Sequence, residues 1–339
     1  MIEARLWKPL KNGAVQCRLC NHYCAIKPGE RGQCGVRENH DGTLYSLNYD
    51  KVAAINLDPV EKKPLYHFQP GSMTFSLATM GCNLTCSFCQ NWSLSQPPRT
   101  GADIRGQVTT PEELVAEAVR LEAASISYTY SEPTIFFELM QDTARLAHKA
   151  GLKNIMVSNG FMSSECLDAL KDDIDAINVD LKCFTEAFYN DVTGARLQPV
   201  LDNLKRIKHE LGWWLEVTTL LIPGKNDSTA ELDQLTDFLV NEIGTDTPWH
   251  ISRFHPDYRM TDAPPTSGYS LDTAYSMGKA KGLEYVYVGN MPGSNKQDTL
   301  CPGCGKELIN RTGFSSSVQG IEDGKCQACG RTIHGIDLG

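Results

Sequence analysis

The sequence of 339 residues has no apolar run of about 18 residues, the minimum for a helix that crosses a membrane. Its first ten residues lack the apolar stretch of a secretory signal peptide. It also lacks a block of basic residues, because Lys and Arg are interspersed with Asp and Glu and the formal net charge is −9. We therefore expect no membrane association, and the charge pattern gives no strong sign of nucleic-acid binding.

Cysteine is abundant, with 13 residues, an odd number that does not suit a framework of disulfides. Without a secretory signal, this usage predicts a reducing, cytoplasmic location and thiolates that ligate metals. Most of the cysteines fall into three spaced groups: Cys17, Cys20, Cys24 and Cys34; Cys82, Cys86 and Cys89; and Cys301, Cys304, Cys326 and Cys329.

The central group, with C-x3-C-x2-C spacing, directly follows an apolar, β-type run at residues 73–78. Three thiolates within eight residues can surround one metal centre, whereas a closed zinc site requires four protein ligands. A [4Fe–4S] cluster held by three cysteines leaves one iron open to a ligand from outside the protein. Cys82, Cys86 and Cys89 are therefore the predicted cluster ligands and the centre of the chemistry.

The two outer groups each contain four cysteines. For Cys17, Cys20, Cys24 and Cys34, structural zinc is the first interpretation and an iron–sulfur cluster is the alternative, because both metals accept four thiolates. Cys301, Cys304, Cys326 and Cys329 form two C-x2-C-G turns, the pattern of a zinc ribbon. An iron site of the rubredoxin type would use the same ligands.

Between these outer groups, apolar or β-branched runs alternate with helical patterns. The runs lie at 73–79, 125–130, 154–158, 176–181, 214–222, 249–254 and 284–288. This alternation predicts an α/β fold with a parallel sheet, as a partial or full barrel first and a doubly wound sheet second. The predicted domains are a four-cysteine region at 1–70, a barrel at 71–292 and a zinc-ribbon tail at 293–339. In such a barrel the chemistry gathers at the carboxyl ends of the strands. Polar residues that stand at those ends are Glu132, Ser158, Asn159, Asp180, Lys182 and His255.

Several stretches resemble one family from end to end. They are residues 31–39, residues 61–68 (Glu-Lys-Lys-Pro-Leu-Tyr-His-Phe), Gly81-Cys82-Asn83, residues 89–92, Tyr130-Ser131-Glu132-Pro133 and the cysteine turns of the tail. Together they resemble the AmmeMemoRadiSam-system enzymes of the radical S-adenosylmethionine (radical SAM) class, relatives of the pyruvate formate-lyase activating enzymes.

The resemblance implies a partial (β/α)6 TIM-type barrel, a [4Fe–4S] cluster on Cys82, Cys86 and Cys89, and S-adenosylmethionine chelated to the open iron. Glu132 would accept from the methionine ammonium, in a motif that reads Gly-Gly-Glu-Pro in the family at large. Ser158 and Asn159 would lie near the methionine and ribose, Asp180 and Lys182 near the carboxylate, and His255 near the adenine.

The implied activity is that of an oxidoreductase: one electron cleaves S-adenosylmethionine to methionine and a 5′-deoxyadenosyl radical, which abstracts a hydrogen atom. The substrate is expected to be a protein or peptide, as for a glycyl-radical activase, with RNA or a small molecule as the alternative. A zinc-scaffolded binding module without catalysis is the non-enzymatic alternative. Implied partners are an electron donor such as flavodoxin or ferredoxin and proteins of the Memo and AMMECR types.

Overall fold

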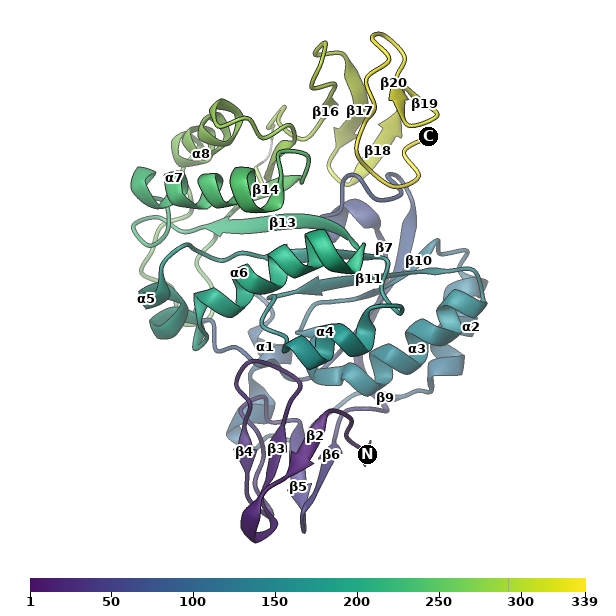
Figure 1. Ribbon diagram of the computed structural model, residues 1–339, viewed down its shortest axis with the longest axis vertical. Helices are drawn as coiled ribbons and strands as arrows, with labels where there is room; N and C mark the ends of the chain where they lie inside the picture. Colours follow the sequence, from purple (N-terminus) through teal and green to yellow (C-terminus); the bar gives the residue numbers. More distant parts are fainter. Residues whose placement is uncertain (292) are drawn as a thin grey trace.

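The computed structural model describes residues 1–291 and 293–339. Small β-structures occupy the two ends of its long axis: the N-terminal strands at one end and the C-terminal strands at the other, with a large sheet and its helices between them (Figure 1). Pro292, the last residue of the predicted barrel domain, lies outside the described residues. No helix in the described residues has the length and apolar character to cross a membrane.

The central sheet contains seven parallel strands within the described residues, so the predicted α/β fold with a parallel sheet is confirmed. These strands are β8 (Met73–Thr79), β10 (Ser125–Tyr128), β11 (Lys153–Ser158), β12 (Ala176–Asp180), β13 (Trp214–Leu221), β14 (Trp249–Arg253) and β15 (Val286–Gly289). They follow one another in chain order across the sheet. Each predicted apolar run overlaps one of them, because strands covered by helices on one side and a filled interior on the other are apolar along most of their length.

The edge next to β8 is extended by two antiparallel strands, β7 (Lys51–Pro59) and β9 (Gln107–Val108). A strand from the region before residue 70 therefore belongs to the central sheet. The proposed boundary between the first two domains stays a prediction.

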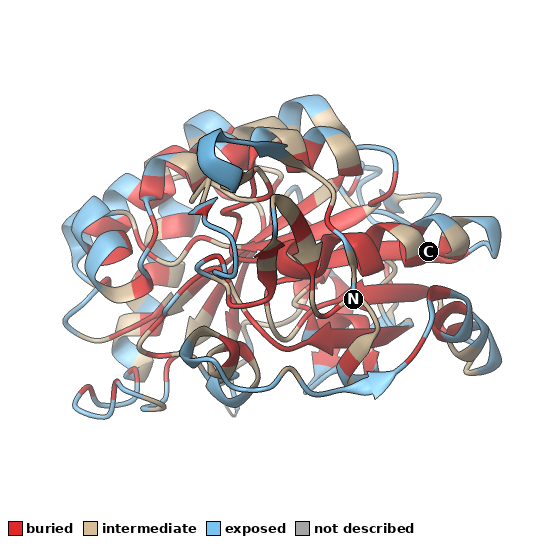
Figure 2. Cartoon of the chain, turned by 90° about the horizontal axis from the view of Figure 1, so that it is seen from below, coloured by how far each residue is buried: buried red, intermediate tan, exposed pale blue. Residues whose placement is uncertain are grey.

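Helices cover the outer side of the sheet, with their outward faces exposed and the strands buried (Figure 2). Helix α2 begins with a complete capping box, in which the side chain of Thr110 accepts from the Glu113 N–H and the Glu113 carboxylate accepts from the Thr110 N–H. The helices are α1 (Trp92–Ser95), α2 (Pro111–Arg120), α3 (Phe137–Lys149), α4 (Ser164–Leu170), α5 (Glu186–Phe188), α6 (Leu197–Arg206), α7 (Thr229–Phe238) and α8 (Gly268–Ala280). Short 3-10 or π turns are η1 (Lys11–Gly13), η2 (Val60–Lys62), η3 (Pro97–Thr100), η4 (Pro133–Phe136), η5 (Tyr189–Thr193), η6 (Ile207–Leu211) and η7 (Leu239–Ile243).

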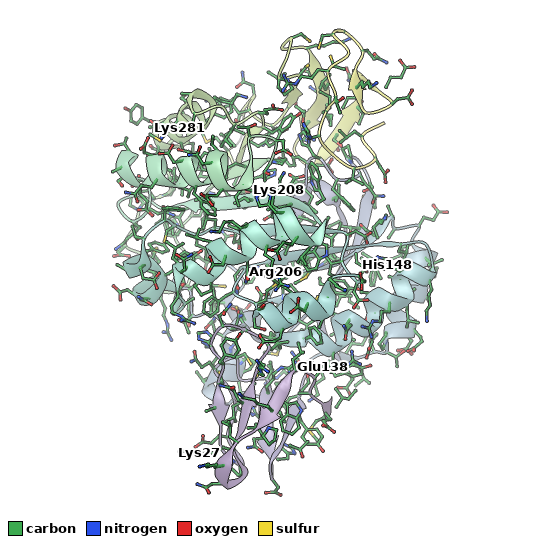
Figure 3. All side chains as sticks on the ribbon, viewed as in Figure 1. Lys27, Glu138, His148, Arg206, Lys208 and Lys281 are labelled. Atoms are coloured by element: carbon green, nitrogen blue, oxygen red, sulfur yellow. The ribbon has the colours of Figure 1, made fainter. Side chains whose placement is uncertain are left out.

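The N-terminal module consists of two small antiparallel sheets. Its strands are β1 (Ile2–Glu3), β2 (Trp7–Pro9), β3 (Val15–Cys17), β4 (Ala25–Ile26), β5 (Arg37–His40) and β6 (Thr43–Ser46). A buried ion pair joins the module to the central domain: Arg37 Nη2 lies 2.6 Å from a carboxylate oxygen of Glu138. Glu138 lies where the N-terminal strands meet α3 (Figure 3).

The C-terminal module carries the last four grouped cysteines on short strands and turns. The strands are β16 (Thr299–Leu300), β17 (Glu307–Thr312), β18 (Ser315–Val318), β19 (Ile321–Glu322) and β20 (Lys325–Cys326). Arg311 of β17 fixes this module to the rest of the chain, because its guanidinium donates to the Tyr66 carbonyl at 2.6 Å and lies over the Tyr66 ring.

The segment Pro64–His67 lies along one face of strands β12 and β13. The side chain of Asn178 donates to the Pro64 carbonyl, and the carboxylate of Glu216 accepts from the backbone N–H groups of Tyr66 and His67. Because side chains alternate along a strand, Asp180 and Thr218 point to the same face, two residues further on. The segment therefore fills the first part of this face and leaves the part nearer the carboxyl ends open.

Candidate active site

A cavity of about 530 Å³ opens at the carboxyl ends of the parallel strands. Its lining includes side chains that follow or end β8, β10, β11, β12, β13 and β14. Of the predicted site residues, Cys82, Cys86, Cys89, Glu132, Ser158, Asn159, Asp180 and Lys182 line it. Parallel strands end at one edge of a sheet, which is why the predicted residues from Cys82 to Lys182, 100 positions apart in the sequence, meet here.

The cysteine loop between β8 and α1 is held by backbone hydrogen bonds to η5. The N–H groups of Thr85 and Ser87 donate to the carbonyls of Thr193 and Val192 at 2.8 and 3.1 Å. The loop leaves the strand through Gly81 at φ 111°, where a Cβ would lie 2.7 Å from a methyl group of Val36, so a side chain does not fit.

The thiols of this loop lie in a largely buried environment. Burial raises the pKa of the Cys82 thiol, and the nearby Glu132 carboxylate raises it further. Burial likewise raises the pKa of Cys86 to about 11, against the opposing charge of Lys182. A bound metal would reverse these shifts, because a coordinated thiol is deprotonated. The cation of Lys182 is the group at this position that favours the thiolate form and an anionic cluster.

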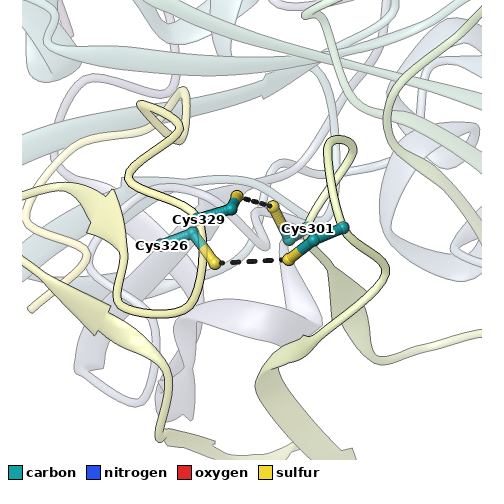
Figure 4. Close-up of side chains that lie close together, drawn as sticks. Cys301, Cys326 and Cys329 are labelled. Carbon is teal, nitrogen blue, oxygen red and sulfur yellow. Dashed lines mark hydrogen bonds between the residues drawn. The ribbon is translucent and has the colours of Figure 1, made fainter.

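The C-terminal cysteines have a different geometry. The sulfurs of Cys301 and Cys329 lie 3.6 Å apart and those of Cys304 and Cys326 lie 3.7 Å apart (Figure 4). Tetrahedral zinc with Zn–S bonds of about 2.3 Å places its sulfurs about 3.8 Å apart. These four thiols thus fit one mononuclear ion. Within the described residues they form the one group of three or more His, Cys, Asp or Glu ligand atoms that all lie within 4.8 Å of one another.

Cys82, Cys86 and Cys89 form no such group among the described residues, so their three sulfurs do not all lie within 4.8 Å of one another. In a [4Fe–4S] cluster each thiolate binds a different iron, so its cysteine sulfurs are separated by the cluster itself. This wider spacing is compatible with a cluster, whereas four thiols on a single zinc ion lie about 3.8 Å apart.

Glu132 is buried beside the cysteine loop and is held by four hydrogen bonds. Its Oε1 accepts from the N–H and hydroxyl of Thr134 and from the hydroxyl of Ser158, at 3.0, 2.6 and 2.9 Å. Its Oε2 accepts from the N–H of Asn159 at 2.8 Å. Burial raises the pKa of Glu132, and these hydrogen bonds limit the rise. The carboxylate thus links the ends of β10 and β11. Its Oε2 accepts a single hydrogen bond from the protein and can accept one more.

Asp180 and Lys182 form an ion pair at the end of β12, with 2.9 Å between Lys182 Nζ and Asp180 Oδ2. The Lys182 side chain is 12% exposed. Burial alone would lower the pKa of Lys182, but the charges of Asp180 and Cys86 raise it well above its ordinary value. Lys182 therefore supplies a permanent positive charge beside the cysteine loop.

His255 lies elsewhere. It is exposed and lines a second cavity of about 920 Å³, which extends toward the C-terminal module and includes Tyr66, His250, Arg311 and Phe314. The two cavities share the side chains of Lys62, Gln90, Thr218 and Ser252. The role of His255 near an adenine stays a prediction.

The residues that sequence reasoning missed are Lys62 and Lys63, which line the first cavity from the segment before Pro64. Both ammonium groups bind Asp58, at 2.8 and 2.6 Å. Burial lowers the pKa of Lys63 to about 8 despite this carboxylate. Burial opposes ionisation of Asp58 too, but the two lysines and the Tyr130 hydroxyl hold its pKa well below the usual range. The signal that could have found these lysines is the polar stretch at 61–68.

Tyr130 stands at the position of the first glycine of the Gly-Gly-Glu-Pro motif. The residue adopts φ 61°, the left-handed region that glycine reaches without strain. Its hydroxyl donates to Asp58 and its carbonyl accepts from Asn91 Nδ2 at 2.8 Å. Tyr130 thus adopts a left-handed conformation although it is not glycine, and its hydroxyl connects the motif to Asp58 and the lysine pair.

Comparison with known proteins agrees with this geometry. Residues 77–236 match the Radical SAM superfamily. An uncharacterized protein of Methanocaldococcus jannaschii is 44% identical over 335 residues, which cover 98% of this chain and 99% of that protein. The chain belongs to the radical SAM superfamily.

Relatives whose names state an activity are more distant. The benzylsuccinate synthase activating enzyme of Thauera aromatica is 24% identical over 159 residues, 45% of this chain and 48% of that enzyme. The GTP 3′,8-cyclase of Listeria welshimeri is 22% identical over 255 residues, 74% of this chain and 72% of the cyclase.

Among solved structures, a radical SAM methyltransferase from Sphaerobacter thermophilus has a TM-score of 0.50 at 17% identity, over 65% of this chain and 67% of its own. Streptococcus suis SuiB bound to the precursor peptide SuiA has a TM-score of 0.51 at 14% identity, over 69% and 52%. At these identities the two structures show a shared fold.

Proposed function

We propose that this radical SAM enzyme cleaves S-adenosylmethionine reductively at the first cavity and acts on a protein or peptide in the manner of a glycyl-radical activase. A [4Fe–4S] cluster held by Cys82, Cys86 and Cys89 would supply the single electron for cleavage of S-adenosylmethionine to methionine and a 5′-deoxyadenosyl radical, with the electron coming from an external reductant. The observation that carries the proposal is the meeting of three separated cysteines with an acid, an ion pair and two polar side chains in one cavity.

Each side chain has a proposed task. Cys82, Cys86 and Cys89 would hold the cluster. Glu132 accepts from the methionine ammonium through Oε2, the oxygen with a single protein donor. Lys182, kept cationic by Asp180, attracts the carboxylate of the methionine part of S-adenosylmethionine. The apolar side chains of Leu84, Phe88 and Leu220 in the lining help to exclude water from the reacting atoms.

The amide and hydroxyl of Asn159 and Ser158 are proposed to position the methionine and ribose. Both side chains are already fixed: Asn159 Nδ2 donates to Asn83 Oδ1 at 2.7 Å, and the Ser158 hydroxyl donates to Glu132. Fixed partners of this kind reduce the ordering that binding requires.

Two observations support a polypeptide substrate: the activating-enzyme relative and the second, larger cavity that joins the first. The alternative, a small molecule or RNA, is favoured by the cyclase relatives, whose names specify a nucleotide, and by their wider coverage of the chain. We further propose zinc at the C-terminal cysteines, a flavodoxin- or ferredoxin-type electron donor, Memo- and AMMECR-type partners, and a reducing cytoplasm as the location.

Isotope transfer tests the substrate class. Anaerobically reconstituted enzyme is incubated with dithionite, S-adenosylmethionine and deuterated candidate substrates. We expect deuterium in 5′-deoxyadenosine from polypeptides, and little from nucleotides or RNA. Deuterium from GTP or RNA alone would establish the alternative, and absence of 5′-deoxyadenosine under all conditions would refute the enzymatic function.

A further inference from the structure

The N-terminal cysteines Cys17, Cys20, Cys24 and Cys34 surround one cavity of about 20 Å³. In the C-terminal module, by contrast, paired sulfurs lie in van der Waals contact at 3.6 and 3.7 Å, as around a single zinc ion. The two four-cysteine groups of this chain therefore differ in construction.

The spacing of the sulfurs makes the same distinction. Within the described residues, no three of the N-terminal cysteine sulfurs lie within 4.8 Å of one another, whereas all four C-terminal sulfurs do. The sulfurs of Cys82, Cys86 and Cys89 likewise do not all lie within 4.8 Å of one another. Four thiols bound to one zinc ion must lie about 3.8 Å apart, whereas thiols bound to separate irons of a cluster need not. By this comparison the N-terminal group resembles the active-site cysteines.

Two unpartnered donors line the same cavity. Arg37 Nε and Asn83 Nδ2 are buried and have no hydrogen-bond partner among the residues that the structure describes. A buried N–H group without an acceptor is costly. The sulfides and thiolates of an iron–sulfur cluster accept hydrogen bonds, and such bonds help to set its potential. The guanidinium of Arg37, which is 1% exposed, is paired with Glu138 through Nη2, so Nε is the group left to donate into the cavity.

We propose that Cys17, Cys20, Cys24 and Cys34 hold a second [4Fe–4S] cluster, not zinc, that receives hydrogen bonds from Arg37 and Asn83. Asn83 follows the active-site ligand Cys82 directly and accepts from Asn159. The second cluster is thus a neighbour of the active-site loop. This inference does not depend on the proposed catalytic function.

Metal content of variants tests the proposal without any measurement of activity. The enzyme is produced with both iron and zinc available and purified anaerobically. We expect about 8 Fe and about 1 Zn per chain in the wild type, and about 4 Fe with the Zn unchanged in C82A/C86A/C89A. After reduction that triple variant should show the electron paramagnetic resonance signal of a [4Fe–4S] cluster, unchanged by S-adenosylmethionine. About 4 Fe and 2 Zn in the wild type, with no iron in the triple variant, would overturn the proposal.

A variant of the N-terminal cysteines gives a second test, which holds even if the triple variant does not fold. C20S/C24S should lose about 4 Fe and retain its Zn. Loss of about 1 Zn with iron unchanged would instead show that the N-terminal site binds zinc. C166S is the matched control, because Cys166 is also buried but belongs to none of the three groups, and it should retain all metals.

Discussion

Replacement of Glu216 tests how the floor of the active-site cavity is held. Glu216 Oε1 accepts from the N–H groups of Tyr66 and His67 and from Trp214 Nε1, at 3.0, 2.7 and 3.0 Å. Its Oε2 lies 2.6 Å from His250 Nε2. The carboxylate is fully buried. It therefore anchors the segment that carries Lys62 and Lys63 into the cavity.

The substitution Glu216→Leu would leave the two backbone N–H groups and the indole N–H buried without an acceptor. Each such donor costs about 1–3 kcal/mol, so we expect a loss of about 3–9 kcal/mol in the free energy of unfolding. This is a large share of the total of about 5–15 kcal/mol that is typical of proteins. Glu216→Gln keeps one oxygen for these three donors, and we expect a loss of about 1–2 kcal/mol.

Urea unfolding followed by tryptophan fluorescence measures both variants, with Glu307→Leu on an exposed position of β17 as the control. An unfolding free energy for Glu216→Leu within about 1 kcal/mol of the wild type would refute the reasoning, because that is less than one unsatisfied donor costs.

The same residue gives a pH dependence. Burial alone would raise the pKa of Glu216, but the hydrogen bond and charge of His250, with His67 and the Tyr66 N–H, lower it below 4.5. A carboxyl with a lowered pKa in the folded state stabilises the fold above its unfolded pKa and loses this effect as the pH falls. The advantage of the wild type over Glu216→Gln should therefore be full at neutral pH and decrease below about pH 4.5. A gap that grows on acidification would contradict this assignment.

Three further variants test other parts of the account. Lys182→Met removes the buried cation and with it one charge-assisted contact, worth about 1.5–3 kcal/mol. We expect S-adenosylmethionine binding to weaken about 10- to 100-fold while the iron content stays unchanged. An unchanged Kd by calorimetry would refute the proposed role of Lys182. Tyr130→Phe removes the hydroxyl that donates a hydrogen bond to Asp58 and should lower the free energy of unfolding by about 0.5–1.5 kcal/mol. A more stable variant would show that this hydrogen bond is unfavourable. Cys304→Ser should release about 1 Zn per chain and leave iron unchanged; retained zinc in metal analysis would exclude these four cysteines as its ligands.

The sequence predicted the strand ends well because the relevant signal is local. An apolar run followed by a polar residue marks both the strand and its end, and the parallel arrangement then brings Ser158 and Asp180 together without further information. The three cysteine groups were evident for the same reason, since each falls within 30 residues.

The inner face of the sheet could not be predicted in this way. Glu216 lies inside a strand and contacts Tyr66, 150 positions away, so no spacing in the sequence relates them. Likewise, Tyr130 has a left-handed conformation and forms hydrogen bonds with Asp58 and Asn91, which lie far from it in the sequence. Residues 61–68 form a motif in the sequence, but only the structure shows that they lie beneath the cavity.

The central claim is that Cys82, Cys86 and Cys89 leave one iron open for S-adenosylmethionine. Its most direct test is the yield of 5′-deoxyadenosine per chain after reduction, in the wild type, in each single Cys→Ala variant of these three residues, and in Cys183→Ala, a buried cysteine outside the groups. The account predicts the product in the wild type and in Cys183→Ala, and none in the other three variants. Product formation that persists after loss of any of the three thiols would contradict it.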